Sequence, residues 1–333
     1  MAHDRQHPEA EQAPIVLSRI VSIEPPGRAR DEFEEIDLYV SSEPSAGVCS
    51  STNVAHPVSK VKSGDDSKEA GLLSSLNEKL NKPECIQPWW EELFDEDFVQ
   101  ITGDLTEDQV RKEVNFLERG LKVQEGGKIL DLACGTGAHA VEFSRRGYQV
   151  VGLDLSQQML THAGERAERS GLTLEFLQAD MREMRFEAEF DGVYCWNTSF
   201  GYFEQETNRR VLDRIHCSLK KGGKFLLGVM NRDYVASHSP SSVHFERASY
   251  TCVDQMHMDW LTSRMHVKRT LMKLEADGKR EIHYSIRLYS VHELIKLFQE
   301  HGFRMERVSG QIATPGAFLG NHSPHLLFEA EKY

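Results

Sequence analysis

Residues Asp131 to Ala140 read DLACGTGAHA, and this stretch decides the fold. The preceding Lys128 to Leu130 is short and largely apolar, which predicts a buried strand that ends at the acid. Gly135 and Gly137 then predict a tight turn, where the backbone can approach a ligand that a Cβ atom would exclude. We expect the Asp131 carboxylate to accept hydrogen bonds from a cationic amino group above this turn. A strand, a glycine turn and a helix in this order predict a nucleoside cofactor site.

Two further acids follow the next two predicted strands. Tyr148 to Leu153 predicts a buried strand that ends at Asp154, and Ser156 is a helix N-cap. A carboxylate at the tip of the second strand is where such folds bind a ribose diol. Leu172 to Leu177 predicts a third strand leading to Asp180, which could meet the exocyclic amine of an adenine.

Several further segments carry a family resemblance. The stretch GLDLS at Gly152 to Ser156, the segment Gln178 to Met181 and LKKGG at Leu219 to Gly223 accompany the glycine turn. With them, roughly Gly126 to Tyr333 resembles the class I S-adenosylmethionine (SAM)-dependent methyltransferases. SFGYF from Ser199 and NRD from Asn231 are most similar to bacterial-type enzymes of small molecules that carry a CGTGxHA turn.

The resemblance implies a fold and a cofactor site. The expected fold is α/β, a Rossmann-like seven-stranded doubly wound sheet of order 3-2-1-4-5-7-6 with the seventh strand antiparallel. Alternating strand and helix signals after Gly126 agree with the layered part of this expectation. The expected SAM-binding residues lie at the ends of the first four strands: Asp131, Ala133, Cys134, Gly135, Gly137, Asp154, Leu155, Asp180, Met181, Trp196 and Asn197.

Two other functions remain open at this point. Gly135-x-Gly137-x-x-Ala140 also fits the dinucleotide fingerprint, which predicts an NAD(P)-dependent oxidoreductase. Against that function, a pyrophosphate would lie near the Asp131 carboxylate, and like charges repel. The other alternative is a protein that binds SAM without transferring a methyl group.

The amino-acid composition limits which molecules the protein is expected to bind. The 333 residues carry a net charge of −13, which argues against general binding of nucleic acid, because phosphates require a basic surface. The six cysteines form no C-x-x-C pair, and we expect no metal site and reduced thiols. Without a long apolar run or a leader pattern, we expect no membrane association and a cytoplasmic location.

The chain divides near residue 85. Residues 1–84 contain 9 basic and 15 acidic residues and are rich in Ser and Pro, which predicts a disordered acidic extension. Residues 85–333 are expected to form the methyltransferase domain. Within it, Pro88 begins a helical pattern with Trp90, Phe94 and Phe98 on one face, and residues 85–121 are expected to supply helices that close over the cofactor.

An insertion at residues 232–288 is predicted to cap the sheet. Met265 to Leu274 and Glu281 to Leu288 predict a β-hairpin around Asp277-Gly278. Such an insertion would rise at the carboxyl edge of the sheet, where ligands bind in open α/β folds. It is therefore the expected wall of the acceptor site.

The acceptor is expected to be a small organic molecule methylated at a nitrogen or oxygen atom. Asn197 is not followed by the Pro-Pro-Tyr or Pro-Pro-Phe typical of enzymes that methylate nucleic acids and proteins. Candidate general bases are His257, Tyr202, Asp254 and His139, with a packing role favoured for His139. The candidate substrate-binding residues are Trp89, Trp90, Ser199, Asn231 and Tyr284.

Overall fold

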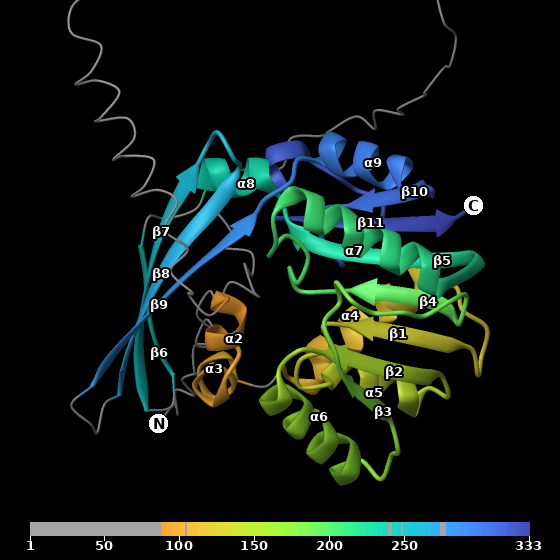
Figure 1. Cartoon of the computed structure of the whole chain (residues 1–333), viewed down its shortest axis with the longest axis horizontal. Coiled ribbons are helices and arrows are strands. Elements are labelled where there is room, and N and C mark those ends of the chain that lie inside the picture. The colour runs from red at the N-terminus through yellow and green to blue at the C-terminus, as the bar shows by residue number, and fades with distance from the viewer. Residues whose placement is uncertain (1–87, 104, 239–241, 248, 274–277) are drawn as a thin grey trace, which may run out of the picture. The chain divides into compact units, whose positions relative to one another are not determined.

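The computed structural model describes residues 88–103, 105–238, 242–247, 249–273 and 278–333 (Figure 1). The predicted acidic extension, residues 1–84, lies outside the described residues. None of the helices in the described ranges is long and apolar enough to cross a membrane.

The main sheet has seven strands in the order β3-β2-β1-β4-β5-β11-β10. The strands are β1 Lys128–Leu132, β2 Gln149–Asp154, β3 Glu175–Gln178, β4 Phe190–Cys195, β5 Leu219–Met230, β10 Phe303–Ser309 and β11 His325–Lys332. Strands β1 to β5 are parallel to one another, whereas β11 is antiparallel to both β5 and β10. The predicted fold class and strand order are therefore confirmed.

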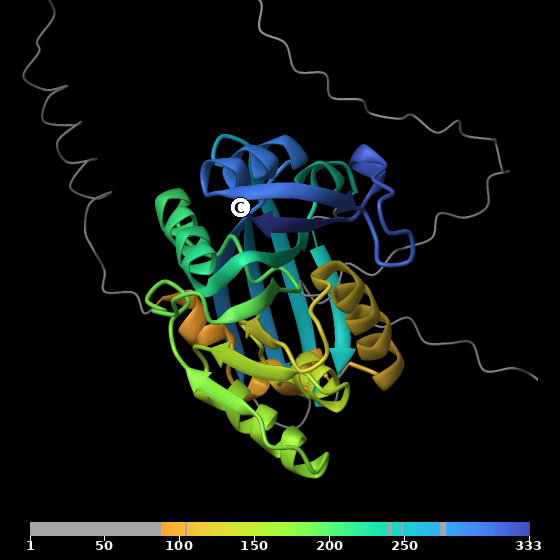
Figure 2. The same ribbon diagram turned by 90° about the vertical axis from the view of Figure 1, so that its right-hand side faces the viewer.

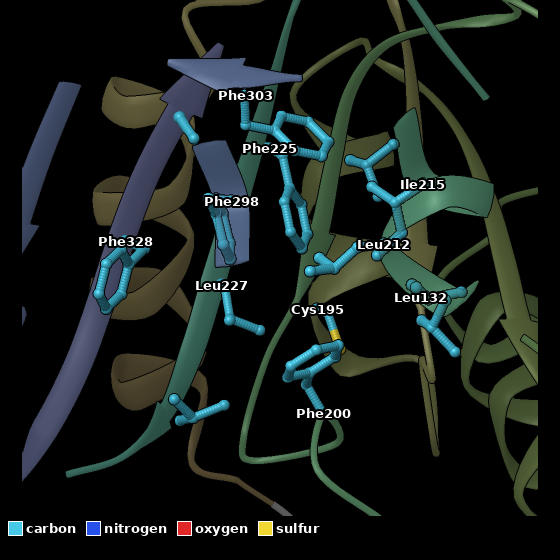
Figure 3. Close-up of a cluster of buried hydrophobic side chains, with 14 of the residues drawn as sticks. Leu132, Cys195, Phe200, Leu212, Ile215, Phe225, Leu227, Phe298, Phe303 and Phe328 are labelled. Carbon is cyan, nitrogen blue, oxygen red and sulfur yellow. The ribbon is translucent and has the colours of Figure 1, made fainter. Parts of the chain in front are cut away.

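Helices cover both faces of this sheet (Figure 2). The flanking helices are α4 Glu107–Leu121, α5 Ala138–Arg145, α6 Gln157–Arg169, α7 Gln205–Ser218 and α9 Val291–Glu300. Residues of α4 and α5 pack against one face, and residues of α7 and α9 pack against the other. The core on the α7 and α9 side contains a group of phenylalanine rings, in which Phe225 stacks on Phe298 at 5.4 Å between ring centroids (Figure 3). Burial on both faces fixes the carboxyl ends of the parallel strands in one row.

Local capping signals determine where three of these helices begin. Thr106 and Gln109 form a capping box at the start of α4, and Ser290 with Glu293 forms one at the start of α9. Ser156 accepts a hydrogen bond from the backbone N–H of Met159 and so caps α6. These side chains satisfy N–H groups that have no partner within the helix.

The helical segment before β1 differs from the prediction. Instead of one helix from Pro88, the chain forms α2 Trp89–Leu93 and α3 Glu96–Thr102. The break follows from Asp95, whose carboxylate accepts a hydrogen bond at 3.0 Å from the backbone N–H of Phe98 and so caps a new helix. Aspartate at this position bonds the local backbone in a non-helical conformation.

The insertion forms a second sheet of four antiparallel strands, in the order β6-β7-β8-β9. Its strands are β6 Ser242–Arg247, β7 Tyr250–Asp259, β8 Arg264–Lys273 and β9 Lys279–Arg287, and helix α8 Arg232–His238 precedes them. β8 and β9 are the predicted hairpin, although Asp277 of its turn lies outside the described residues. Strands β6 and β7 were not predicted from the sequence. The buried row of β7 contains the charged residue Asp254, which hides its apolar alternation.

The cap sheet faces the carboxyl edge of the main sheet, with α2 and α3 between them (Figure 1). Leu93 of α2 and Ile101 of α3 share an apolar core with cap residues such as Ile286. Arg280 of β9 donates hydrogen bonds to Asp95, the N-cap residue of α3, and to Asp97 within α3. These bonds link the cap to the two helices. The two short helices are thus held over the edge where parallel sheets bind ligands.

Candidate active site

A cavity of about 230 Å³ lies between the ends of β1, β2 and β4, the helices α2 and α3, and the cap sheet. One half is formed by the loops that follow the strands of the main sheet and contains the acidic residues Asp131, Asp154 and Asp180. The other half is largely aromatic and includes Trp89 and Tyr284. We call these the acidic half and the aromatic half of the cavity.

Asp131 is a buried carboxylate that faces the acidic half. The residue is 3% exposed, and its Oδ2 atom has no hydrogen-bond partner within the described part of the chain. Burial raises the pKa of Asp131 to about 6, although the nearby His139 opposes this effect. A buried carboxylate with an unsatisfied oxygen favours a cationic hydrogen-bond donor as its ligand. The ammonium group of the methionine end of SAM has this chemistry.

The loop after β1 forms an open cradle beside Asp131. Ala133, Gly135 and Gly137 all have positive φ angles, of 59°, 53° and 71°. A Cβ atom on Gly135 would meet no neighbouring atom within 4 Å, so the space above this residue is open to a ligand. A Cβ atom on Gly137 would lie 2.8 Å from that of Ala163, so glycine is needed there for α5 to pack against α6.

Asp154 ties the end of β2 to this loop. Its Oδ2 accepts a hydrogen bond from the Gly135 N–H and its Oδ1 accepts one from the Ser156 N–H, both at 2.9 Å. Burial raises the pKa of Asp154, whereas these backbone hydrogen bonds oppose the shift. Each carboxylate oxygen keeps a second acceptor site, which suits a pair of ribose hydroxyls. Leu155 lines the cavity next to it.

Asp180 is engaged by a neighbouring side chain. Arg182 donates from Nε to both Asp180 oxygens at 2.9 Å, and although burial acts to raise the pKa of Asp180, these hydrogen bonds lower it. The Arg182 guanidinium lies over the rings of Trp90, at 5.2 Å, and Phe203, at 4.7 Å. Trp90 therefore packs toward the Asp180 side of the cavity, together with the lining residue Met181.

A partly buried cluster of polar side chains supports the loop after β4. Trp196 donates from Nε1 to Glu113 Oε2 at 2.9 Å, and His139 Nε2 lies 2.7 Å from the same oxygen. Asn197 has a φ angle of 54°, an uncommon conformation for a residue other than glycine, and it lines the cavity. His139 is held by Glu113 and lines the cavity, and Trp196 is both buried and part of the cavity wall.

The aromatic half joins residues from three parts of the chain. Trp89 of α2 contacts Tyr202 at 4.9 Å and Tyr284 of β9 at 5.6 Å between ring centroids. Burial raises the pKa values of both tyrosines, so their hydroxyls remain protonated at neutral pH. Ser199 also lines the cavity, and its Oγ donates to the Trp196 carbonyl oxygen at 3.1 Å. The structure thus brings Trp89, Ser199, Tyr202 and Tyr284 together.

Three of the residues singled out from the sequence lie elsewhere. His257 is exposed on the cap sheet and does not line this cavity. Asp254 is 1% exposed and also lies outside the lining; its two oxygens accept hydrogen bonds from Arg269 at 2.8 and 2.7 Å. Asn231 is buried and donates to the carbonyl oxygens of Gly320 and Ser323, so it holds a loop. The structure therefore places these three candidate residues outside the lining of this cavity.

The sequence analysis missed two polar residues of the site, Arg269 and Glu113. Arg269 lines the cavity from the cap, yet in the sequence it is one of several cations in an exposed-looking strand. Glu113 lies in α4 among charged neighbours and gave no separate signal. No group of three or more His, Cys, Asp or Glu residues with metal-binding geometry occurs in the ranges that the structure describes.

Comparison with known proteins identifies a methyltransferase domain. Residues 129–223 match a family model described as "Methyltransferase domain". A Bacillus subtilis (strain 168) protein, YqeM, whose name gives it as a candidate methyltransferase, is 29% identical over 62% of this chain and 85% of its own length. A glycine/sarcosine N-methyltransferase of Aphanothece halophytica is 30% identical over 48% of this chain and 62% of its own length.

The fold is shared with solved structures. The crystal structure of an S-adenosylmethionine-dependent methyltransferase from Clostridium acetobutylicum ATCC 824 superposes with a TM-score of 0.60. It covers 70% of this chain and 95% of its own length at 14% sequence identity, so this likeness concerns the fold.

Proposed function

We propose that this chain, a class I SAM-dependent methyltransferase, transfers the methyl group of SAM to a small organic molecule. The methylated atom of this acceptor is a nucleophilic nitrogen or oxygen. The observation that carries the proposal is the cavity itself. Its acidic half, which fits the cofactor, continues into an aromatic half enclosed by α2 and the cap sheet.

Within this proposal, the acidic half binds the cofactor. The Asp131 carboxylate would bind the ammonium group, the loop from Ala133 to Gly137 would surround the methionine end, and Asp154 would accept from the ribose hydroxyls. Met181, Trp90 and the Asp180–Arg182 pair would border the adenine. Bound SAM supplies an activated methyl group on a sulfonium, so the residues of the chain mainly need to position the acceptor.

The aromatic half is suited to positioning a small acceptor. Trp89, Tyr202 and Tyr284 present ring faces and edges that bury an apolar or planar molecule. Correct orientation of two reactants is worth about 7 to 11 kcal/mol of the barrier. With both tyrosine hydroxyls protonated, these residues would donate hydrogen bonds to the acceptor rather than remove its proton. An acceptor atom with a lone pair at neutral pH therefore fits best. The name of one relative, a glycine/sarcosine N-methyltransferase, gives a small amine-containing acceptor for that protein.

The proposal also concerns the organisation of the chain. We take residues 85–333 as the catalytic domain, with residues 85–121 as the helices over the cofactor and residues 232–288 as the cap. α2 and α3 support this division, because Trp89, Phe94 and Phe98 line the cavity. A cytoplasmic location belongs to the same proposal and agrees with the free cysteines Cys134, Cys195, Cys217 and Cys252.

Turnover tests the function directly. The purified full chain is titrated with SAM in a calorimeter and then incubated with SAM and a library of amines, amino acids, phenols and amino sugars. We expect SAM binding and the release of S-adenosylhomocysteine with at least one acceptor. Binding without release from any acceptor would instead favour a protein that only binds SAM.

A further inference from the structure

We infer that Arg269 forms a subsite for a carboxylate group of the acceptor, positioned by the buried Asp254. This inference rests on the proposed function, because it places one end of a small acceptor in the aromatic half of the cavity. It narrows the acceptor to molecules that carry a carboxylate in addition to the methylated atom.

The first observation is the burial of a charged pair that packing alone does not require. The Arg269 and Asp254 side chains are only 1% and 2% exposed. Burying two charges costs several kcal/mol each, and well-packed apolar residues at such positions are often as stable or more stable. A buried pair beside a substrate cavity therefore points to a role in recognition.

The second observation is the orientation of the pair. Arg269 lines the cavity, whereas Asp254 does not, so the positive end of the pair faces the space for the acceptor. Asp254 accepts hydrogen bonds from Nε and Nη2 of Arg269, at 2.8 and 2.7 Å. No hydrogen bond from Nη1 of Arg269 is found within the described part of the structure. The N–H groups of this nitrogen are therefore left to donate to a ligand in the cavity. A carboxylate matches the edge of a guanidinium, because its two oxygens can accept two parallel N–H hydrogen bonds.

The third observation is the distribution of charge in the cavity. Among the described residues that line it, Arg269 is the only arginine or lysine, and it extends from β8 of the cap. Asp131, Asp154 and Asp180 lie in the acidic half. An anionic acceptor is repelled by that half and attracted toward the cap, which would direct its carboxylate away from the sulfonium side. The Tyr284 ring lies 5.7 Å from the Arg269 guanidinium and forms the adjacent wall.

The experiment compares carboxylates with neutral amides of the same shape. The full chain, saturated with S-adenosylhomocysteine, is titrated with benzoate and with benzamide. Turnover with SAM is then measured for anthranilate against anthranilamide and for 3-hydroxybenzoate against 3-hydroxybenzamide. A hydrogen bond to a charged group corresponds to a preference of roughly 10- to 150-fold for the carboxylate.

Variants assign this preference to Arg269. The double variant Arg269→Met/Asp254→Leu replaces the ion pair with apolar residues, which avoids leaving one buried charge unpaired. We expect it to bind S-adenosylhomocysteine as the wild type does and to lose the carboxylate preference. Arg269→Lys keeps a charge but not the planar donor group, and should reduce the carboxylate preference by about tenfold. This single variant provides the test if the double variant does not fold. Lys268→Met, on the same strand but outside the cavity lining, is the matched control and should keep the preference.

The outcomes separate the two proposals. Equal binding and turnover of carboxylates and amides by the wild type would overturn the subsite, as would a preference that persists unchanged in both Arg269 variants. If only neutral acceptors are methylated, the proposed function is supported and the carboxylate subsite is refuted. Loss of the proposed function would show instead as no turnover of any acceptor in the library, while benzoate binding would still decide whether Arg269 recognises a carboxylate.

Discussion

Replacing Asp131 with asparagine should affect cofactor binding and stability in opposite directions. The carboxylate is 3% exposed, and its pKa is about 6 against an ordinary value of 3.8. Because the raised pKa means that the folded state holds its proton more tightly, the charged form costs stability. The cost is absent below the ordinary pKa of 3.8, increases between 3.8 and 6, and is complete above 6. The difference of 2.2 pKa units corresponds to about 3 kcal/mol at pH 7.

The Asp131→Asn variant removes this cost without changing the size of the side chain. Without cofactor, we expect its free energy of unfolding at pH 7 to exceed that of the wild type by up to about 3 kcal/mol, or roughly 6 to 12 °C in melting temperature. The gap should close as the pH falls toward 4, where the wild-type carboxyl is neutral as well. The variant should also bind SAM less tightly by about 1.5 to 3 kcal/mol, because it loses the charged partner of the ammonium group.

Two measurements check these expectations. Thermal unfolding of both proteins from pH 4 to pH 8 gives the stability difference, and calorimetric titration with SAM over pH 5.5 to 8 gives the affinities. Wild-type affinity should decrease as the pH falls through 6, while that of the variant should change little. A variant that is less stable than the wild type at pH 7 and binds SAM equally well would refute the assignment of Asp131 as the ammonium site.

The other expectations concern separate parts of the chain. Asp154→Ala should weaken SAM binding by about 1.5 to 3 kcal/mol in calorimetry, because it removes charged hydrogen bonds to the ribose and to the Gly135 loop; unchanged affinity would exclude it from the site. Tyr284→Ala should lower kcat/KM for the acceptor while SAM affinity stays within a factor of about two, whereas His257→Ala, outside the cavity, should leave both unchanged. A chain that starts at residue 85 should keep the melting temperature and SAM affinity of the full chain, whereas one that starts at residue 101 should lose much of both, since it lacks α2 and most of α3; insolubility of the first chain would contradict the proposed boundary.

Much of the fold could be predicted because its signals are local. A short apolar run followed by an acid predicted β1, and the N-cap at Ser156 predicted the start of α6. Each of these signals depends on residues within one turn or one strand. The strand order came from the family resemblance, since pairing between distant strands leaves little trace in a single sequence.

The same local logic located the acidic half of the cavity. In a parallel sheet every strand presents its carboxyl end at one edge, so Asp131 and Asp154 were expected to lie close together once their strands were assigned. The hydrogen bond from the Gly135 N–H to Asp154 agrees with that expectation. Topology, rather than detailed packing, determines this part of the site.

The aromatic half was decided by tertiary structure. In an antiparallel sheet the register and face of each residue depend on the pairing of strands, and a shift of one residue moves a side chain to the other face. His257 therefore lies outside the cavity while Tyr284 lines it, although both are in the cap. Asp254 and Arg269 are 15 positions apart in the sequence, but the register of β7 and β8 places them directly opposite each other. The sequence by itself determined that a nucleoside-type cofactor site follows the parallel strands, whereas only the pairing of the cap strands determined which charged residue of the cap lines the cavity.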